Sequence, residues 1–161
     1  MGPQKRLMQF GIVIVVAVVV QLIFIAADCR NTPVRIAEDF ARNYFYLDPA
    51  MDRQLCTALS ADGETVTDYL YKVTRDAAQR GFSKKYVRRM FTELHIHIIS
   101  QDDASAEVHV TGETRTAINP AFMVIGKLFH LGEYHPVDMH LDLVKEPEGW
   151  RVCGEVDGFN T

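Results

Sequence analysis

The stretch LHIHIISQDDASAEVHV (94–110) alternates apolar and polar side chains on both sides of a short polar turn. Successive side chains of an extended chain point to opposite faces, so each half of the stretch has one apolar face. Residues 101–103 supply the turn between the halves. The pattern predicts a β-hairpin that buries its apolar face and leaves its histidines on the other.

Two more alternating runs follow, over 137–143 and 150–156, with turn residues at 147–149 between them. If the apolar faces share one core, the hairpin register is determined, because a slip of one residue would expose every apolar side chain. The register then pairs Ile96 with Val110, Ile98 with Val108 and His97 with His109. We expect one antiparallel sheet of four strands.

Helical periodicity precedes the strands. Thr32 is a typical N-cap, and Pro33 suits the first turn of a helix that continues to Tyr46. Apolar residues at helical spacing predict a short second helix over 51–59 and a longer third one over 65–79. Three helices followed by antiparallel strands predict an α+β fold, with the helices on the apolar face of the sheet.

An apolar run, FGIVIVVAVVVQLIFIAA (10–27), follows Lys5 and Arg6 near the amino terminus. As a helix it would measure about 27 Å, close to the ~30 Å hydrocarbon core of a bilayer. A cleaved secretory signal has a shorter core and a small residue where this run has Ile25. The interpretation that we favour is an uncleaved transmembrane helix.

The flanking charges predict the orientation of this helix. Lys5 and Arg6 should hold the amino terminus in the cytoplasm, because basic residues stay on that side. The expected organisation is a cytoplasmic segment 1–9, a membrane helix 10–27, a linker 28–32 and an extracytoplasmic α+β domain 33–161. In a bacterium this is a single-pass inner-membrane protein with a periplasmic domain. Gln21 should face either a partner helix or the headgroups.

Most histidines fall on the polar face of the predicted sheet. The face contains His95, His97, His109 and His140 together with Glu107, Asp138 and Asp142. Imidazole is a good ligand for zinc and copper, so the four histidines are one candidate metal site. Spacing along strands is weak support for a metal, however. We favour a face around His97 and His109 that contacts another subunit or a second copy of the chain, and we expect no bound metal or cofactor.

The segment NPAFMVIGKLFHLG (119–132) is almost wholly apolar and too short to span a bilayer. Two interpretations remain open. The one we favour is a lid buried against the domain. The other is a docking helix for a membrane surface or partner protein, with Phe122, Ile125 and Phe129 in the contact.

Cys56 and Cys153 are the two cysteines inside the domain, and an oxidising compartment would allow them to form a disulfide. The predicted geometry argues against this disulfide. Alternation places Cys153 on the polar face of the sheet, whereas Cys56 lies in a predicted helix over the apolar face. Cys29 lies at the membrane exit, and we expect it to be a free thiol.

Helices followed by a meander that ends in GWRV (149–152) resemble the nuclear transport factor 2-like superfamily, an α+β cone shared with SnoaL-type cyclases. The resemblance covers about residues 33–158 and implies three helices packed on a curved sheet of four strands. Enzymes of the superfamily line the interior of the cone with a catalytic polar pair. Here the strand Asp and His residues fall on the outer face, so the resemblance assigns no catalytic residue.

Composition and motifs narrow the function. The net charge is −4, and no basic cluster has the length of a nucleic-acid surface. No phosphate loop or nucleophile motif occurs in the sequence. We therefore favour a non-enzymatic, membrane-anchored accessory or scaffolding subunit of a larger inner-membrane or periplasmic assembly. The alternative is a small-molecule binder or enzyme with an interior pocket, for which Tyr44, Tyr69 and Tyr134 are the candidate polar groups.

Overall fold

The computed structural model describes residues 3–28, 31–61, 63–116, 134–156 and 159. It divides into two compact units, Met1–Thr32 and Pro33–Thr161. The apolar segment 119–132 lies outside the described residues, together with Phe122, Ile125 and Phe129. The choice between a lid and a docking helix therefore stays a prediction.

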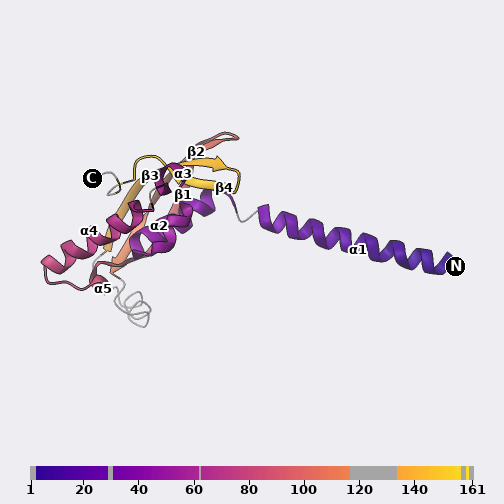
Figure 1. The fold of residues 1–161 in the computed structure, drawn as a ribbon, viewed down its shortest axis with the longest axis horizontal. Coiled ribbons are helices and arrows are strands. Elements are labelled where there is room, and N and C mark those ends of the chain that lie inside the picture. Colours follow the sequence, from indigo (N-terminus) through magenta and orange to yellow (C-terminus); the bar gives the residue numbers. More distant parts are fainter. Residues whose placement is uncertain (1–2, 29–30, 62, 117–133, 157–158, 160–161) are drawn as a thin grey trace. The chain divides into compact units, whose positions relative to one another are not determined.

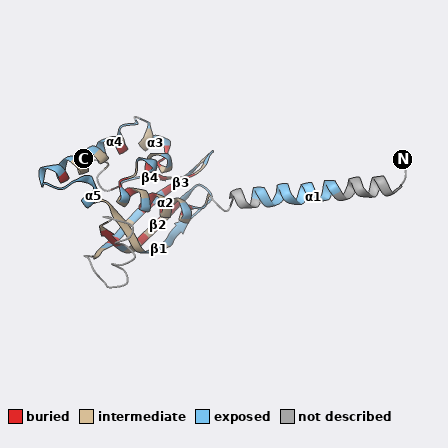
Figure 2. Cartoon of the chain, turned by 90° about the horizontal axis from the view of Figure 1, so that it is seen from below, coloured by how far each residue is buried: buried red, intermediate tan, exposed pale blue. Residues whose placement is uncertain are grey.

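The first unit contains one helix, α1 (Pro3–Asp28), which extends beyond the predicted 10–27 at both ends. Side chains are described for 12–24, and every one of them is exposed. All are apolar except Gln21, and Figure 2 shows this stretch in the colour of exposed residues. Within the part of the chain that the structure describes, no helix combines the length and apolarity needed to cross a membrane.

The second unit is an α+β domain built on a four-stranded antiparallel sheet, as predicted (Figure 1). The strands follow one another in the order of the chain: β1 (Arg89–Gln101), β2 (Ser105–Thr116), β3 (Tyr134–Glu146) and β4 (Gly149–Cys153). The predicted hairpin register is confirmed. It pairs Ile96 with Val110, His97 with His109 and Ile98 with Val108. The sheet therefore has the two faces that the alternation requires.

Two of the three predicted helices are confirmed. They are α2 (Pro33–Tyr46) and α4 (Thr65–Gln79). The prediction of one helix over 51–59 was wrong, because the structure has a 3-10 helix, η1 (Pro49–Gln54), then extended backbone at Leu55 and Cys56, then α3 (Thr57–Ser60). A further short helix, α5 (Lys84–Val87), precedes β1.

The break in 51–59 has a clear cause in the backbone hydrogen bonds. Asp48 caps η1 by accepting a hydrogen bond from the Ala50 N–H, and the 3-10 helix ends after two turns. Leu55 then forms a parallel bridge with Val152, and the Cys56 N–H donates to the Val152 carbonyl oxygen at 2.8 Å. Backbone groups of this segment thus form hydrogen bonds with the edge of β4, whereas in a continuous helix they would bond within the helix.

The core lies between α2 and the sheet, where α2 contacts all four strands (Figure 2). Phe40 of α2 is completely buried, as are Val108 and Val152 of the sheet. An aromatic cluster joins α2 to α4 and to the carboxyl-terminal segment: Phe40, Tyr44, Phe45, Tyr69, Phe91 and Phe159. Phe40 and Tyr44 are buried and the other four rings are half-buried against the core, so the cluster contributes to the hydrophobic stabilisation of the domain.

Candidate functional site

The polar face of the sheet carries a row of three histidines on neighbouring strands. His97 of β1 lies opposite His109 of β2, and His109 lies opposite His140 of β3. Residues on either side of each histidine point inward, so the three imidazoles share the outer face. Directly opposed residues on antiparallel strands have Cβ atoms ~5 Å apart, which brings the side chains within reach of one another.

His109 and His140 form the tightest part of this row. Their rings stack with centroids 4.5 Å apart and an interplanar angle of 20°. Asp138, two residues before His140 on the same face, places its Oδ1 atom 2.8 Å from His109 Nε2. One potential ligand atom from each of these three residues lies within 4.8 Å of the other two.

Solvent reaches this cluster. The side chain of His109 is 29% exposed, that of His140 58% and that of Asp138 74%. Glu107 adds a second carboxylate, with Oε1 3.6 Å from His140 Nδ1. Two imidazoles among carboxylates can hold a transition-metal ion or contact a complementary polar surface.

The sequence predicted the correct face of the sheet for the candidate site but did not predict that Asp138 belongs to the cluster. Of the four predicted histidines, His109 and His140 lie together in the cluster. The other two, His95 and His97, are outside the group of converging ligand atoms, and His95 pairs with Thr111. Asp138 was expected nearby but not as a ligand. Its diagonal position relative to His109, two pairs along the ladder and on the same face, was the available signal.

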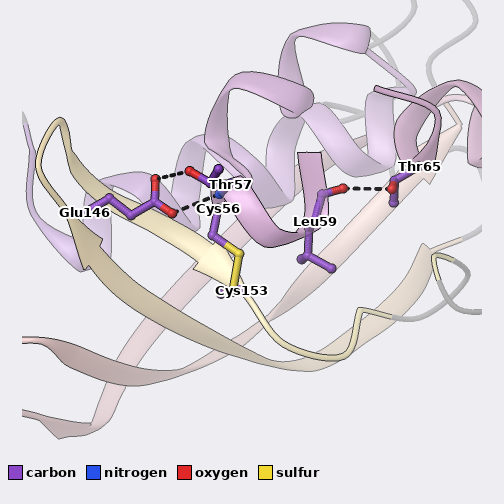
Figure 3. Close-up of a disulfide and its surroundings, with 6 residues drawn as sticks. All are labelled: Cys56, Thr57, Leu59, Thr65, Glu146 and Cys153. Carbon is purple, nitrogen blue, oxygen red and sulfur yellow. Dashed lines mark hydrogen bonds between the residues drawn. A yellow bond between two sulfur atoms is a disulfide. The ribbon is translucent and has the colours of Figure 1, made fainter. Parts of the chain in front are cut away.

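The structure joins Cys56 and Cys153 by a disulfide, with Cα atoms 5.3 Å apart (Figure 3). The geometric objection to this disulfide was wrong. Cys56 is not on a helix over the apolar face; it is extended and runs beside the edge of β4, next to the bridge between Leu55 and Val152. Two segments that run side by side at a sheet edge bring their cysteines within disulfide distance. A cysteine on a helix packed over the opposite face would be too far away.

Hydrogen bonds reinforce the same corner of the domain. Glu146, at the end of β3, accepts from the Thr57 N–H at 2.8 Å and from the Thr57 hydroxyl at 3.1 Å. The Thr65 hydroxyl donates to the Leu59 carbonyl oxygen at 2.7 Å and fixes the start of α4 (Figure 3). The disulfide is therefore one part of a wider attachment of α3 to the sheet.

The tyrosines proposed as pocket groups divide between two places. Tyr44 and Tyr69 stack at 5.0 Å inside the aromatic cluster, whereas Tyr134 packs its ring against the Arg115 guanidinium, also at 5.0 Å. Burial, followed by the neighbouring Tyr44, raises the pKa of Tyr69 well above its usual range. The Tyr69 phenol is therefore neutral at physiological pH, and its ring packs within the aromatic cluster.

Two surface depressions are found among the residues that the structure describes. The larger, about 460 Å³, lies beside the disulfide and is lined by η1, α3, the β3–β4 turn and β4. The smaller, about 200 Å³, lies between α2 and the start of β1. Neither is lined by Tyr44, Tyr69 or Tyr134.

Comparison of the chain with protein-family models, with curated proteins and with solved structures found no match.

Proposed function

We propose that this chain is a non-enzymatic, single-pass membrane protein whose extracytoplasmic α+β domain serves as an accessory or scaffolding subunit of a larger assembly. The observation that carries the proposal is the exposed apolar surface of α1. Its large apolar side chains over 12–24 are 44–70% exposed. A helix that is apolar all round is stable only when lipid or another protein covers it.

The length of the apolar run favours lipid as that cover. The described side chains span 13 positions (12 to 24), which is about 20 Å of helix. Together with the apolar residues that flank them in the sequence, the run 10–27 reaches about 27 Å and approaches the ~30 Å of a bilayer core.

The disulfide supports an extracytoplasmic position for the domain. Disulfides persist in the periplasm and other oxidising compartments and are rare in the cytosol. The Cys56–Cys153 disulfide therefore agrees with the orientation that Lys5 and Arg6 predict, with the amino terminus in the cytoplasm and the domain in the bacterial periplasm.

The packing of two of the three candidate tyrosines favours an accessory role over the pocket-based alternative. The cone of the nuclear transport factor 2-like superfamily remains our proposal for the curvature and ancestry of the sheet. In that fold the interior cavity holds substrate. Here Tyr44 of α2 stacks on Tyr69 of α4, and Phe40 and Phe159 pack against the same cluster. Gln21 gives α1 a polar group with which to bond a neighbouring helix.

The native size of the protein in mild detergent tests this proposal. The full chain, solubilised from membranes of its own organism, should migrate as a complex that contains a second, reproducible protein in fixed proportion. A lone monomer with a bound organic ligand would contradict the scaffolding role and support the alternative. Gln21→Leu, with Val20→Leu as its matched control, then tests whether α1 contributes to the contact.

A further inference from the structure

We infer that His109, His140 and Asp138 form a binding site for a zinc-like divalent metal ion on the outer face of the sheet. The sheet places all three on one face, and the β2–β3 register sets their mutual positions. Because strand pairing already holds the three side chains close together, a bound metal ion would need to fix only their side-chain torsion angles.

The distances are compatible with ligation after small side-chain movements. Ligand atoms bound tetrahedrally to zinc at 2.0–2.1 Å lie about 3.3 Å from one another. His109 Nε2 and Asp138 Oδ1 are 2.8 Å apart, so an ion replacing the proton between them needs little change. No two ligand atoms of the cluster are more than 4.8 Å apart, so no separation must close by more than about 1.5 Å. The 58% exposed ring of His140 has room to rotate by that amount.

Two further carboxylates, those of Glu107 and Asp142, lie next to the cluster and favour a bound cation. Glu107 lies 3.6 Å from His140 Nδ1, which suits an outer partner that orients the imidazole. Asp142 lies directly opposite Glu107 on the same face and adds a further carboxylate. The three ligands leave a fourth position on the solvent side, since Asp138 and His140 are largely exposed.

The ligand types decide which ion fits. Two imidazole nitrogens and one carboxylate oxygen suit Zn²⁺, Cu²⁺ or Ni²⁺, whereas Mg²⁺ and Ca²⁺ prefer sites made of oxygen alone. The site should therefore discriminate among divalent ions, which a merely acidic surface would not do.

Titration of Zn²⁺ alone into the full chain tests this site. The protein is kept in detergent micelles, carries no polyhistidine tag and is treated with chelator beforehand. We expect saturable binding of one Zn²⁺ per chain that excess Mg²⁺ does not displace. His109→Ala and His140→Ala should each weaken binding at least about tenfold, since even outer-shell partners are worth that much. The matched control His95→Ala changes an exposed histidine on the same face and should bind as wild type does.

A further variant and a further measurement keep the test valid if one of the histidine variants fails to fold. Asp138→Asn alters a 74% exposed side chain, so the fold should survive, and it should also weaken binding. Electron paramagnetic resonance of bound Cu²⁺ should show nitrogen ligands that decrease in His140→Ala. No saturable Zn²⁺ binding to the wild type, or equal binding by the wild type and folded variants of His109, His140 and Asp138, would overturn the site.

Discussion

Phe40 lies where α2 meets the sheet and has no exposed surface. Its ring contacts Tyr44 and Phe159 within the aromatic cluster. Phe40→Ala should lower the free energy of unfolding by about 3–5 kcal/mol, because it removes buried apolar area and leaves a cavity. Urea unfolding in detergent micelles measures the change. Phe82→Ala removes a 55% exposed ring and should stay within about 0.5 kcal/mol of the wild type, so equal losses from both variants would contradict this account of the core.

Asp102 stabilises the β1–β2 turn through its charged form. Its carboxylate accepts hydrogen bonds from the Ala104 N–H at 2.7 Å, the Ser105 N–H at 2.6 Å and the Ser105 hydroxyl at 2.9 Å. These bonds hold the pKa of Asp102 below its usual range. A lowered folded-state pKa contributes stability above the unfolded-state pKa of ~3.9, and that contribution is lost as the pH falls further.

The difference in melting temperature between the wild type and Asp102→Ala should therefore be constant above about pH 5 and shrink below about pH 4. Thermal melts over a pH series measure it, with Asp103→Ala as the neighbouring control. A difference that stays constant down to pH 2 would show that the charge of Asp102 does not stabilise the turn.

At the scale of elements, the backbone of β1 leaves no room for a side chain at Gly112 of β2. The register of the two strands shifts between Phe91 and Glu93, and a Cβ at Gly112 would overlap the Glu93 carbonyl oxygen and lie 3.2 Å from Leu94 Cα. Gly112→Ala should lower the free energy of unfolding by about 1–3 kcal/mol, because backbone must move to admit the methyl group. Glu113→Ala, on the same strand and exposed, is the control, and urea unfolding compares the two. A neutral Gly112→Ala would mean that the strands separate there at little cost.

The sequence predicted a helix or strand correctly where its conformation depends on residues close together in the chain. Thr32 and Pro33 marked the start of α2, and period-two alternation located the strands and the register of the β1–β2 hairpin. The segment 51–59 was mispredicted because its conformation depends on a distant partner: the edge of β4, almost 100 residues later, bonds Leu55 and Cys56. Ile98 pairs with Val108 as predicted but is 44% exposed, since it lies on an edge strand beside a register shift.

For the candidate site, the sequence predicted which face of the sheet carries the histidines, but not which side chains come together. Burial of Val108 and Val110 alone requires that His109 face outward, and the hairpin register follows. The pairing of His109 with His140 depended on the β2–β3 register, across a segment of the chain that contains no alternation. Side-chain torsions determine which of the neighbouring groups converge, and no sequence pattern reports them. The sequence placed Asp138 on this face, but only the structure shows that its carboxylate converges with His109 and His140.

For the molecule as a whole, the Cys56–Cys153 disulfide closes most of the domain, because the two residues are 97 positions apart. A cross-link of this length restricts the unfolded chain, and its loss should lower the free energy of unfolding by about 2–5 kcal/mol. The double variant Cys56→Ala/Cys153→Ala and the wild type treated with reductant should both show this loss in urea unfolding. Cys29→Ser leaves the disulfide intact and should not. A wild type whose stability is unchanged by reductant would contradict a structural role for the disulfide.

The central claim is that α1 anchors the domain outside the cytoplasm. The most direct measurement is protease accessibility of the domain in intact spheroplasts, followed by a carboxyl-terminal epitope on the full chain. We predict that external protease destroys the epitope while a cytoplasmic marker survives, and that the untreated chain stays with carbonate-washed membranes. An epitope that remains protected until the membrane is dissolved, or a chain that carbonate releases into the supernatant, would contradict the account.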